Sequence, residues 1–249
     1  MLKTFIASCL MLVGFSRIEA TPTSAFWTVC TTDVQETNVP HIDVDNYFRL
    51  FHHNRDQSAI WPIDVGLTYG LFNWNDMKAE IGIDYIAPTR DPVYFNAKLG
   101  IAEEKLFTYS PGMSLGIFNV GTKTHGQNKT NQNIGDFCIS KSLPEAMLIG
   151  GRVTAGTFVG NHTMGKNRVG GMVAYDRQFC PAKDASGTEY HKWEFIADYA
   201  SGKNTIGGGG FATIYYFTPK ISIETGPVWF NDQSINGKWK WSIQLDIDI

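Results

Sequence analysis

Trp241-Ser242-Ile243-Gln244-Leu245-Asp246-Ile247-Asp248-Ile249, the last stretch of the chain, alternates apolar and polar side chains without a break. Such alternation predicts a β-strand with one apolar face and one polar face. The final residues of a soluble domain are usually frayed, so a strand that runs to the last residue indicates a sheet that needs this strand for closure. We therefore predict a β-barrel. In a transmembrane barrel the apolar face meets lipid and the polar face lines the lumen.

The first residues have the features of a secretory leader. Met1-Leu2-Lys3 gives a positive start, residues 4–15 are mostly apolar, and Ile18-Glu19-Ala20 ends in a small residue suited to cleavage. We therefore expect residues 1–20 to be a signal peptide. The rest of the chain contains no run of about 18 apolar residues, so the sequence predicts no transmembrane helix.

The composition favours one all-β domain. The chain is 43% hydrophobic and 18% charged and contains 25 glycines, which suits strands and turns better than helices. A net charge of −3 argues against a nucleic-acid partner. We expect residues 41–249 to form the barrel. Residues 21–40 are expected to form an extended segment, which either enters the lumen as a plug or packs against the rim.

Strand patterns recur along the mature chain at a nearly regular spacing. In the clearest one, Met77, Ala79, Ile81, Ile83 and Tyr85 alternate with more polar or small residues. Each candidate strand has roughly the 9–11 residues that a tilted strand needs to cross a bilayer. The candidates are 41–51, 63–71, 77–85, 93–101, 113–121, 132–142, 148–160, 168–177, 191–200, 208–217, 220–230 and 241–249. The sequence therefore predicts an antiparallel barrel of about twelve strands, within a range of ten to fourteen.

An even number of strands fixes the side on which each connection lies. With residue 249 in the periplasm, 73–76, 143–147 and 218–219 become short periplasmic turns, as bacterial barrels require. The external connections are then 52–60, 122–131, 161–167, 201–207 and 231–238. Two predicted periplasmic connections, 102–112 and 178–190, are long for this side.

Charges of both signs fall on the polar faces of the predicted strands, where they would line the lumen. These predicted lumen-lining residues are Lys78, Glu80, Asp84, Lys98, Arg152, Lys192, Glu194, Asp198, Lys240, Asp246 and Asp248. In a water-filled lumen they would filter small solutes, which predicts a narrow passive channel for small hydrophilic solutes or ions. If they pair across a filled interior, the barrel is instead structural or adhesive and has a closed lumen. A secreted soluble β-sandwich is a third alternative.

Several motifs resemble a group of uncharacterised, porin-like outer-membrane barrel proteins of Gram-negative bacteria. They are Thr31-Thr32-Asp33-Val34-Gln35, Gly82-Ile83-Asp84-Tyr85 with Asp91-Pro92-Val93-Tyr94-Phe95-Asn96-Ala97-Lys98, Asp198-Tyr199 with Ser201-Gly202-Lys203-Asn204, and Tyr216-Phe217-Thr218-Pro219 with Gly226-Pro227-Val228-Trp229-Phe230-Asn231. The resemblance implies the cell outer membrane as location. It implies membrane lipid, lipopolysaccharide and the barrel-assembly machinery as partners. It brings no established activity, catalytic residues or cofactor, and this chain closes on Ile249 where such barrels end on an aromatic residue.

The sequence offers no convincing enzyme site. His162-Thr163 lacks the serine of outer-membrane phospholipases, and Asp43-Val44-Asp45 is not accompanied by the Asp-x-His of omptin-like proteases. His41, Asp43 and Asp45 would share one strand face and could hold a divalent cation. Polar lumen residues produce the same pattern, which we favour, so we predict no metal and no enzymatic activity.

Three cysteines remain after removal of the leader that contains Cys9. At most one pair can close within the chain, and the envelope is oxidising. Cys138 lies inside a predicted strand, whereas Cys30 precedes the first strand and Cys180 begins a predicted periplasmic connection. A Cys30–Cys180 disulfide is therefore one candidate, and three unpaired thiols are the alternative.

Overall fold

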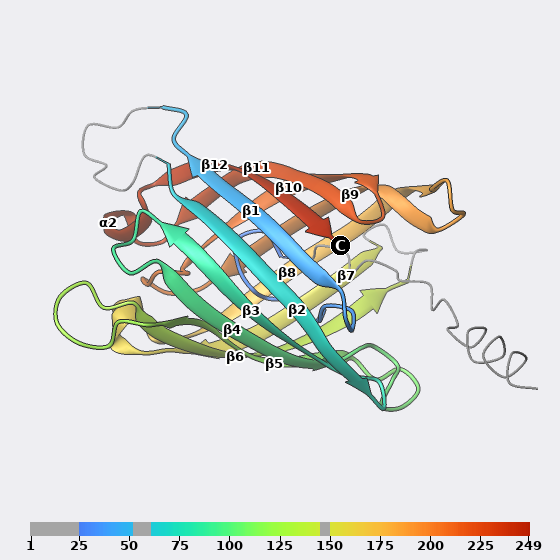
Figure 1. Cartoon of the computed structure of the whole chain (residues 1–249), viewed down its shortest axis with the longest axis horizontal. Coiled ribbons are helices and arrows are strands. Elements are labelled where there is room, and N and C mark those ends of the chain that lie inside the picture. The colour runs from blue at the N-terminus through green and yellow to red at the C-terminus, as the bar shows by residue number, and fades with distance from the viewer. Residues whose placement is uncertain (1–24, 52–60, 145–149) are drawn as a thin grey trace, which may run out of the picture.

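The computed structural model describes residues 25–51, 61–144 and 150–249 and shows a closed antiparallel β-barrel (Figure 1). Two short helices, η1 (His162–Met164) and α2 (Gln233–Asn236), lie in connections between strands. The strands are β1 (Pro40–Phe48), β2 (Ile63–Trp74), β3 (Met77–Ala87), β4 (Val93–Ile101), β5 (Gly112–Gly121), β6 (Asn131–Leu143), β7 (Gly151–Val159), β8 (Val169–Lys183), β9 (Glu189–Ala200), β10 (Gly208–Thr218), β11 (Ile221–Phe230) and β12 (Trp239–Asp248). The predicted barrel of about twelve strands is confirmed, and the β-sandwich alternative is wrong. The proposed signal peptide, residues 1–20, lies outside the described residues.

The last strand closes the barrel, as its alternation predicts. β12 pairs with β11 on one side and with β1 on the other. The backbone N–H of Ile249 donates to the carbonyl oxygen of Pro40 at 2.9 Å, so the final residue takes part in closure. Every strand therefore has two neighbours, and the sheet has no free edge of the kind that invites aggregation.

The barrel has two ends that differ in their connections. The terminal end, where β1 begins and β12 ends, carries 75–76, 102–111, 184–188 and 219–220; the distal end carries 88–92, 122–130, 160–168, 201–207 and 231–238. Asn75 and Asp76 both have positive φ (50° and 66°), which suits the tight hairpin between β2 and β3. The predicted connection 52–60 lies outside the described residues, and 143–147 lies partly outside them.

One predicted connection is wrong. Residues 178–190 are not a long loop, because β8 continues to Lys183 and β9 begins at Glu189, which leaves five residues between them. Pro181 still faces His191 in the register of this hairpin. Figure 1 shows the hairpin projecting beyond the C-terminus at the terminal end. The positive φ of Cys180 (61°) and the neighbouring proline interrupt the pattern that the sequence would otherwise show.

The two faces of the wall differ as the alternation requires. On β12, Ile243 points outward and is exposed, whereas Ser242 and Gln244 are buried inside. The same outward exposure of large apolar side chains recurs around the barrel. Examples are Leu67, Ile81, Ile83, Phe95, Leu115, Ile117, Phe137, Ile139, Val153, Val173, Phe195 and Phe211.

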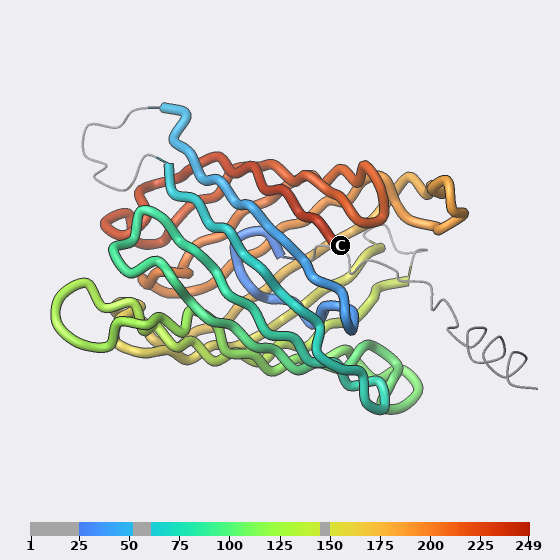
Figure 2. The backbone as a smooth tube through the Cα atoms, in the orientation of Figure 1, coloured from blue at the N-terminus to red at the C-terminus, as the bar shows by residue number. Residues whose placement is uncertain are grey.

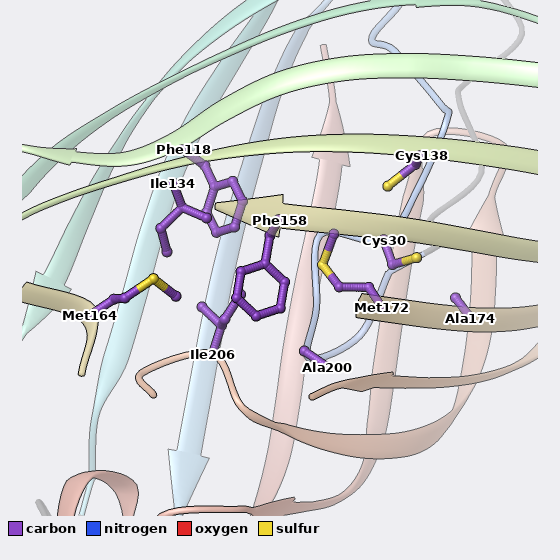
Figure 3. Packing of buried hydrophobic residues seen from close by; sticks show 10 residues of the cluster. All are labelled: Cys30, Phe118, Ile134, Cys138, Phe158, Met164, Met172, Ala174, Ala200 and Ile206. Atoms are coloured by element: carbon purple, nitrogen blue, oxygen red, sulfur yellow. The ribbon is translucent and has the colours of Figure 1, made fainter. Parts of the chain in front are cut away.

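Residues 25–39 lie inside the barrel, where they form the blue loop of Figure 2. We call these residues the inner segment. Phe26 and Cys30 of the inner segment belong to two buried apolar clusters together with side chains of the barrel wall. One of these clusters is drawn in Figure 3. The apolar interior of this protein is therefore shared between the wall and the inner segment.

Candidate functional site: the lumen and the inner segment

The start of the inner segment is held by one buried carboxylate of β9. Oδ2 of Asp198 accepts hydrogen bonds from the backbone N–H groups of Phe26, Trp27 and Thr28 at 2.8, 2.8 and 3.0 Å. A carboxylate that accepts several backbone N–H bonds makes strong, charge-assisted contacts. Gly210 supplies the space for Phe26, because a Cβ there would lie 2.7 Å from the Phe26 ring.

The middle of the inner segment is held by a bidentate ion pair. Arg152 on β7 donates from both terminal nitrogens to the carboxylate of Asp33, at 2.6 and 2.7 Å. Its Nε donates to Asp176 on β8 at 2.9 Å, so one guanidinium joins the segment to two strands. On β6, the hydroxyl of Ser140 lies 2.5 Å from that of Thr32. Bidentate pairs of this type fix geometry as well as adding energy.

The end of the inner segment is attached to the opposite side of the wall. The backbone N–H of Gln35 donates to Glu80 on β3 at 2.5 Å, and the Gln35 side chain donates to Asp248 on β12 at 2.8 Å. Glu36 pairs with Lys78. The segment thus contacts strands on opposite sides of the lumen and crosses it.

A large acidic cavity lies in the lumen beside the inner segment. Its volume is about 580 Å³, and residues 25–29 together with Thr31, Asp33 and Gln35 form part of its lining. Residues of the distal connections, such as Thr89, Thr205 and Asn236, also line it. The lining includes nine carboxylates (Asp33, Asp43, Asp45, Asp64, Glu80, Asp84, Asp136, Glu224 and Asp246) but two lysines, Lys98 and Lys240. This excess of negative charge makes the cavity attractive to cations.

The structure places most of the sequence-predicted lumen residues on the inner face of the wall. Lys78, Glu80, Lys98, Arg152, Asp198 and Asp248 bond to the inner segment. Asp84, Lys240 and Asp246 line the cavity, and Glu194 is buried and accepts from Tyr216 and Gln178 at 2.8 and 3.1 Å. Lys192 does not join them. It is exposed, because it lies on the part of β9 that belongs to the projecting hairpin.

Sequence reasoning missed several acidic residues of the cavity. Asp64, Asp136 and Glu224 were not among the predicted lumen residues, although they occupy inward positions on β2, β6 and β11. The period-2 pattern carries enough information to find them, since they share parity with recognised inward residues. Asp33 was also missed, and here the strand pattern gives no signal because its partner Arg152 is far away along the chain.

The structure does not contain the predicted Cys30–Cys180 disulfide. All three described cysteines are free: Cys30 and Cys138 are buried, and Cys180 is exposed on β8. Cys30 and Cys138 belong to the same buried cluster, and Figure 3 shows their side chains near each other beside Met172. The prediction required Cys30 to lie at the periplasmic mouth of the barrel. It is wrong because Cys30 enters the lumen with the inner segment.

The outer surface carries aromatic side chains near the strand ends. Tyr85, Tyr199 and Trp229 are exposed toward the distal end, and Trp193 is exposed toward the terminal end. Trp239 and Trp241 are partly exposed at the start of β12. Amphipathic rings at such positions favour the headgroup level of a bilayer.

Searches for two other kinds of site give no candidate within residues 25–51, 61–144 and 150–249. No group of three or more histidine, cysteine, aspartate or glutamate side chains there is arranged to hold a metal ion. No helix in this described part of the chain is long and apolar enough to cross a membrane.

Comparison with known proteins gives weak structural likenesses. No protein-family model matches the chain, and no curated protein matches it in sequence. A solved structure of the NanC porin aligns with 84% of this chain and 98% of its own length, at 10% identity and a TM-score of 0.38. The attachment invasion locus protein Ail of Yersinia pestis, solved with the heparin analogue sucrose octasulfate, aligns with 84% of this chain and 94% of its own, at 8% identity and a TM-score of 0.20. These likenesses are too distant to bear on function.

Proposed function

We propose that this protein is an outer-membrane β-barrel and forms a narrow passive channel for small hydrophilic solutes or ions, which the inner segment holds closed. The membrane location is supported by the outward-facing apolar side chains and by the closure of the sheet, because a spanning sheet must have no free edge. Membrane lipid, lipopolysaccharide and the barrel-assembly machinery are the partners that follow from this location.

The observation that carries the channel proposal is the polar cavity inside the barrel. A small barrel of about eight strands can fill its interior with side chains, whereas a twelve-stranded barrel is wider. Here a space of about 580 Å³ remains, and its walls are rich in charged groups. Charged walls suit hydrated solutes, and the excess of carboxylates favours cations.

The inner segment supports a second candidate, a structural or adhesive barrel whose lumen stays closed. Asp198 and Arg152 together make five hydrogen bonds to the segment, three to backbone N–H groups and two to Asp33. Hydrogen bonds that involve a charged group are worth about 1.5–3 kcal/mol each. Permanent retention of the segment would exclude conduction, so its release is the property that separates the two candidates.

Single-channel conductance of the full mature protein in planar bilayers tests the proposal. We expect small, brief openings for the native sequence, and longer openings when Asp33→Ala and Asp198→Ala together weaken the attachment of the segment. Asp76→Asn is a matched control, because it removes a carboxylate that pairs with Lys105 in the exposed turn at the terminal end. If neither the native protein nor the double variant conducts, and heat-modifiable migration shows that both are folded, the closed barrel is favoured.

A further inference from the structure

Two pairs of carboxylates stand directly opposite each other on the lumen wall. Asp43 of β1 faces Asp246 of β12, and Asp45 of β1 faces Asp64 of β2. Like charges directly opposite each other destabilise an antiparallel sheet. Two such pairs on one strand therefore indicate a wall that is completed by positive charge from elsewhere.

The same two cross-strand rows continue onto the next strands. In the first row, Gly66 of β2 lies between Asp43 of β1 and Asp84 of β3. In the second row, Gln244 of β12 lies between Asp45 of β1 and Glu224 of β11. We call Asp43, Asp45, Asp64, Asp84, Glu224 and Asp246 the carboxylate wall, and all six line the cavity. Gly66 leaves room for this arrangement, since a Cβ there would lie 2.3 Å from Oδ1 of Asp43.

Two oxygens of the carboxylate wall are buried without a hydrogen-bond partner among the described residues. They are Oδ1 of Asp64 and Oε2 of Glu224. The Glu224 side chain belongs to a residue that is 1% exposed, yet it borders the cavity. A buried carboxylate oxygen without a donor is costly, so these atoms point to donors that a ligand would bring.

Three basic groups near the wall also contact other residues. Lys98 pairs with Glu80 at 3.3 Å, and Lys240 donates to the carbonyl oxygen of Asn236 at 2.6 Å. His41 lies 3.5 Å from Asp246 but also 3.0 Å from Asp248. The lining of the cavity thus holds more carboxylates than basic side chains.

The spacing of the wall indicates the kind of cation that fits. The two rows are two residues apart along each strand, which corresponds to about 6–7 Å, and neighbouring strands are about 4.8 Å apart. Within the described residues, no three of these groups converge on one metal ion. The cavity is large enough for a small organic molecule, and Ile86 adds apolar surface to its lining. A flexible chain with several ammonium groups separated by short alkyl stretches matches both features.

We propose that the carboxylate wall is a binding site for small polycations of the linear aliphatic polyamine class. The ammonium groups donate to the carboxylates, including the unpartnered oxygens of Asp64 and Glu224, and the alkyl stretches pack on the apolar lining. Binding of this kind requires no conduction, so a failure of the channel proposal would not contradict this inference, and the reverse also holds.

Calorimetric titration of the full mature protein, refolded in detergent, tests the site with spermidine as probe and butylamine as a matched monoamine. We expect saturable binding of spermidine that weakens as salt is raised, with butylamine at least tenfold weaker. The variant with both Asp45→Asn and Glu224→Gln should lose at least tenfold in spermidine affinity. The control variant with Asp76→Asn and Glu189→Gln removes two carboxylates that pair with exposed lysines at the terminal end of the barrel, and it should bind normally.

Three results would overturn the proposal: no saturable spermidine binding, equal binding of spermidine and butylamine, or equal losses in the two double variants. Tighter binding of Mg²⁺ than of spermidine would assign the wall to hydrated metal ions instead. The melting temperature of the native protein gives a test that does not depend on the folding of a variant. Spermidine should raise this temperature and butylamine should not.

Discussion

Arg152 shows how much of this structure depends on single residues of the lumen. Its guanidinium joins Asp33 of the inner segment to Asp176 of the wall, and its side chain is 20% exposed. One partner belongs to the inner segment and the other to β8, so the residue links the inner segment to the barrel as well as β7 to β8. Arginine suits this role better than lysine because its planar fork matches two carboxylates at once.

The substitution Arg152→Ala should lower the free energy of unfolding by roughly 2–3 kcal/mol, because it leaves two carboxylates in the lumen without their donor. The measurement is the free energy of unfolding in urea with lipid vesicles. Arg177→Ala is the matched control, because Arg177 lies on β8 with its position on the outward side of the strand. Equal losses for the two variants would show that the ion pairs of Arg152 add nothing specific.

At the scale of elements, the strands could be read from the sequence almost completely. The pattern predicts 93–101, which are the bounds of β4, and most other predicted strands differ from the structure by one to three residues. β8 is the exception, because Cys180 and Pro181 hide its last part. The inner segment could not be placed by pattern at all. Its bonds to the wall, such as Thr28 to Asp198 across 170 residues, depend on the closed barrel and leave no local signal.

The alternation along the strands makes a prediction about the two faces of the wall. Ile243→Arg puts a charge on the outward face and should cost about 2–4 kcal/mol if the residue lies near the bilayer midplane. Asp64→Arg introduces the same side chain on the inner face, close to Asp43 and Asp84, and should be tolerated. Unfolding in vesicles and heat-modifiable migration measure both effects. A tolerated Ile243→Arg would mean that this face does not meet lipid.

At the scale of the whole molecule, the barrel and the inner segment form one unit. The wall supplies the polar partners of the segment, and the segment occupies part of the lumen and lines its cavity. A twelve-stranded barrel lies between small barrels filled by side chains and wide open porins. In a barrel of this intermediate size the inner segment crosses the lumen, and a large acidic cavity remains beside it.

The position of the inner segment is the central claim, and mapping of the thiol pair tests it most directly. The full mature protein is oxidised in its membrane with copper phenanthroline, which removes two electrons and two protons from each thiol pair, and is then digested without reduction. We expect a peptide in which Cys30 is linked to Cys138, because the two thiols are buried in the same cluster inside the barrel. Recovery of Cys30 linked to Cys180 would place the segment at the mouth of the barrel and contradict the account.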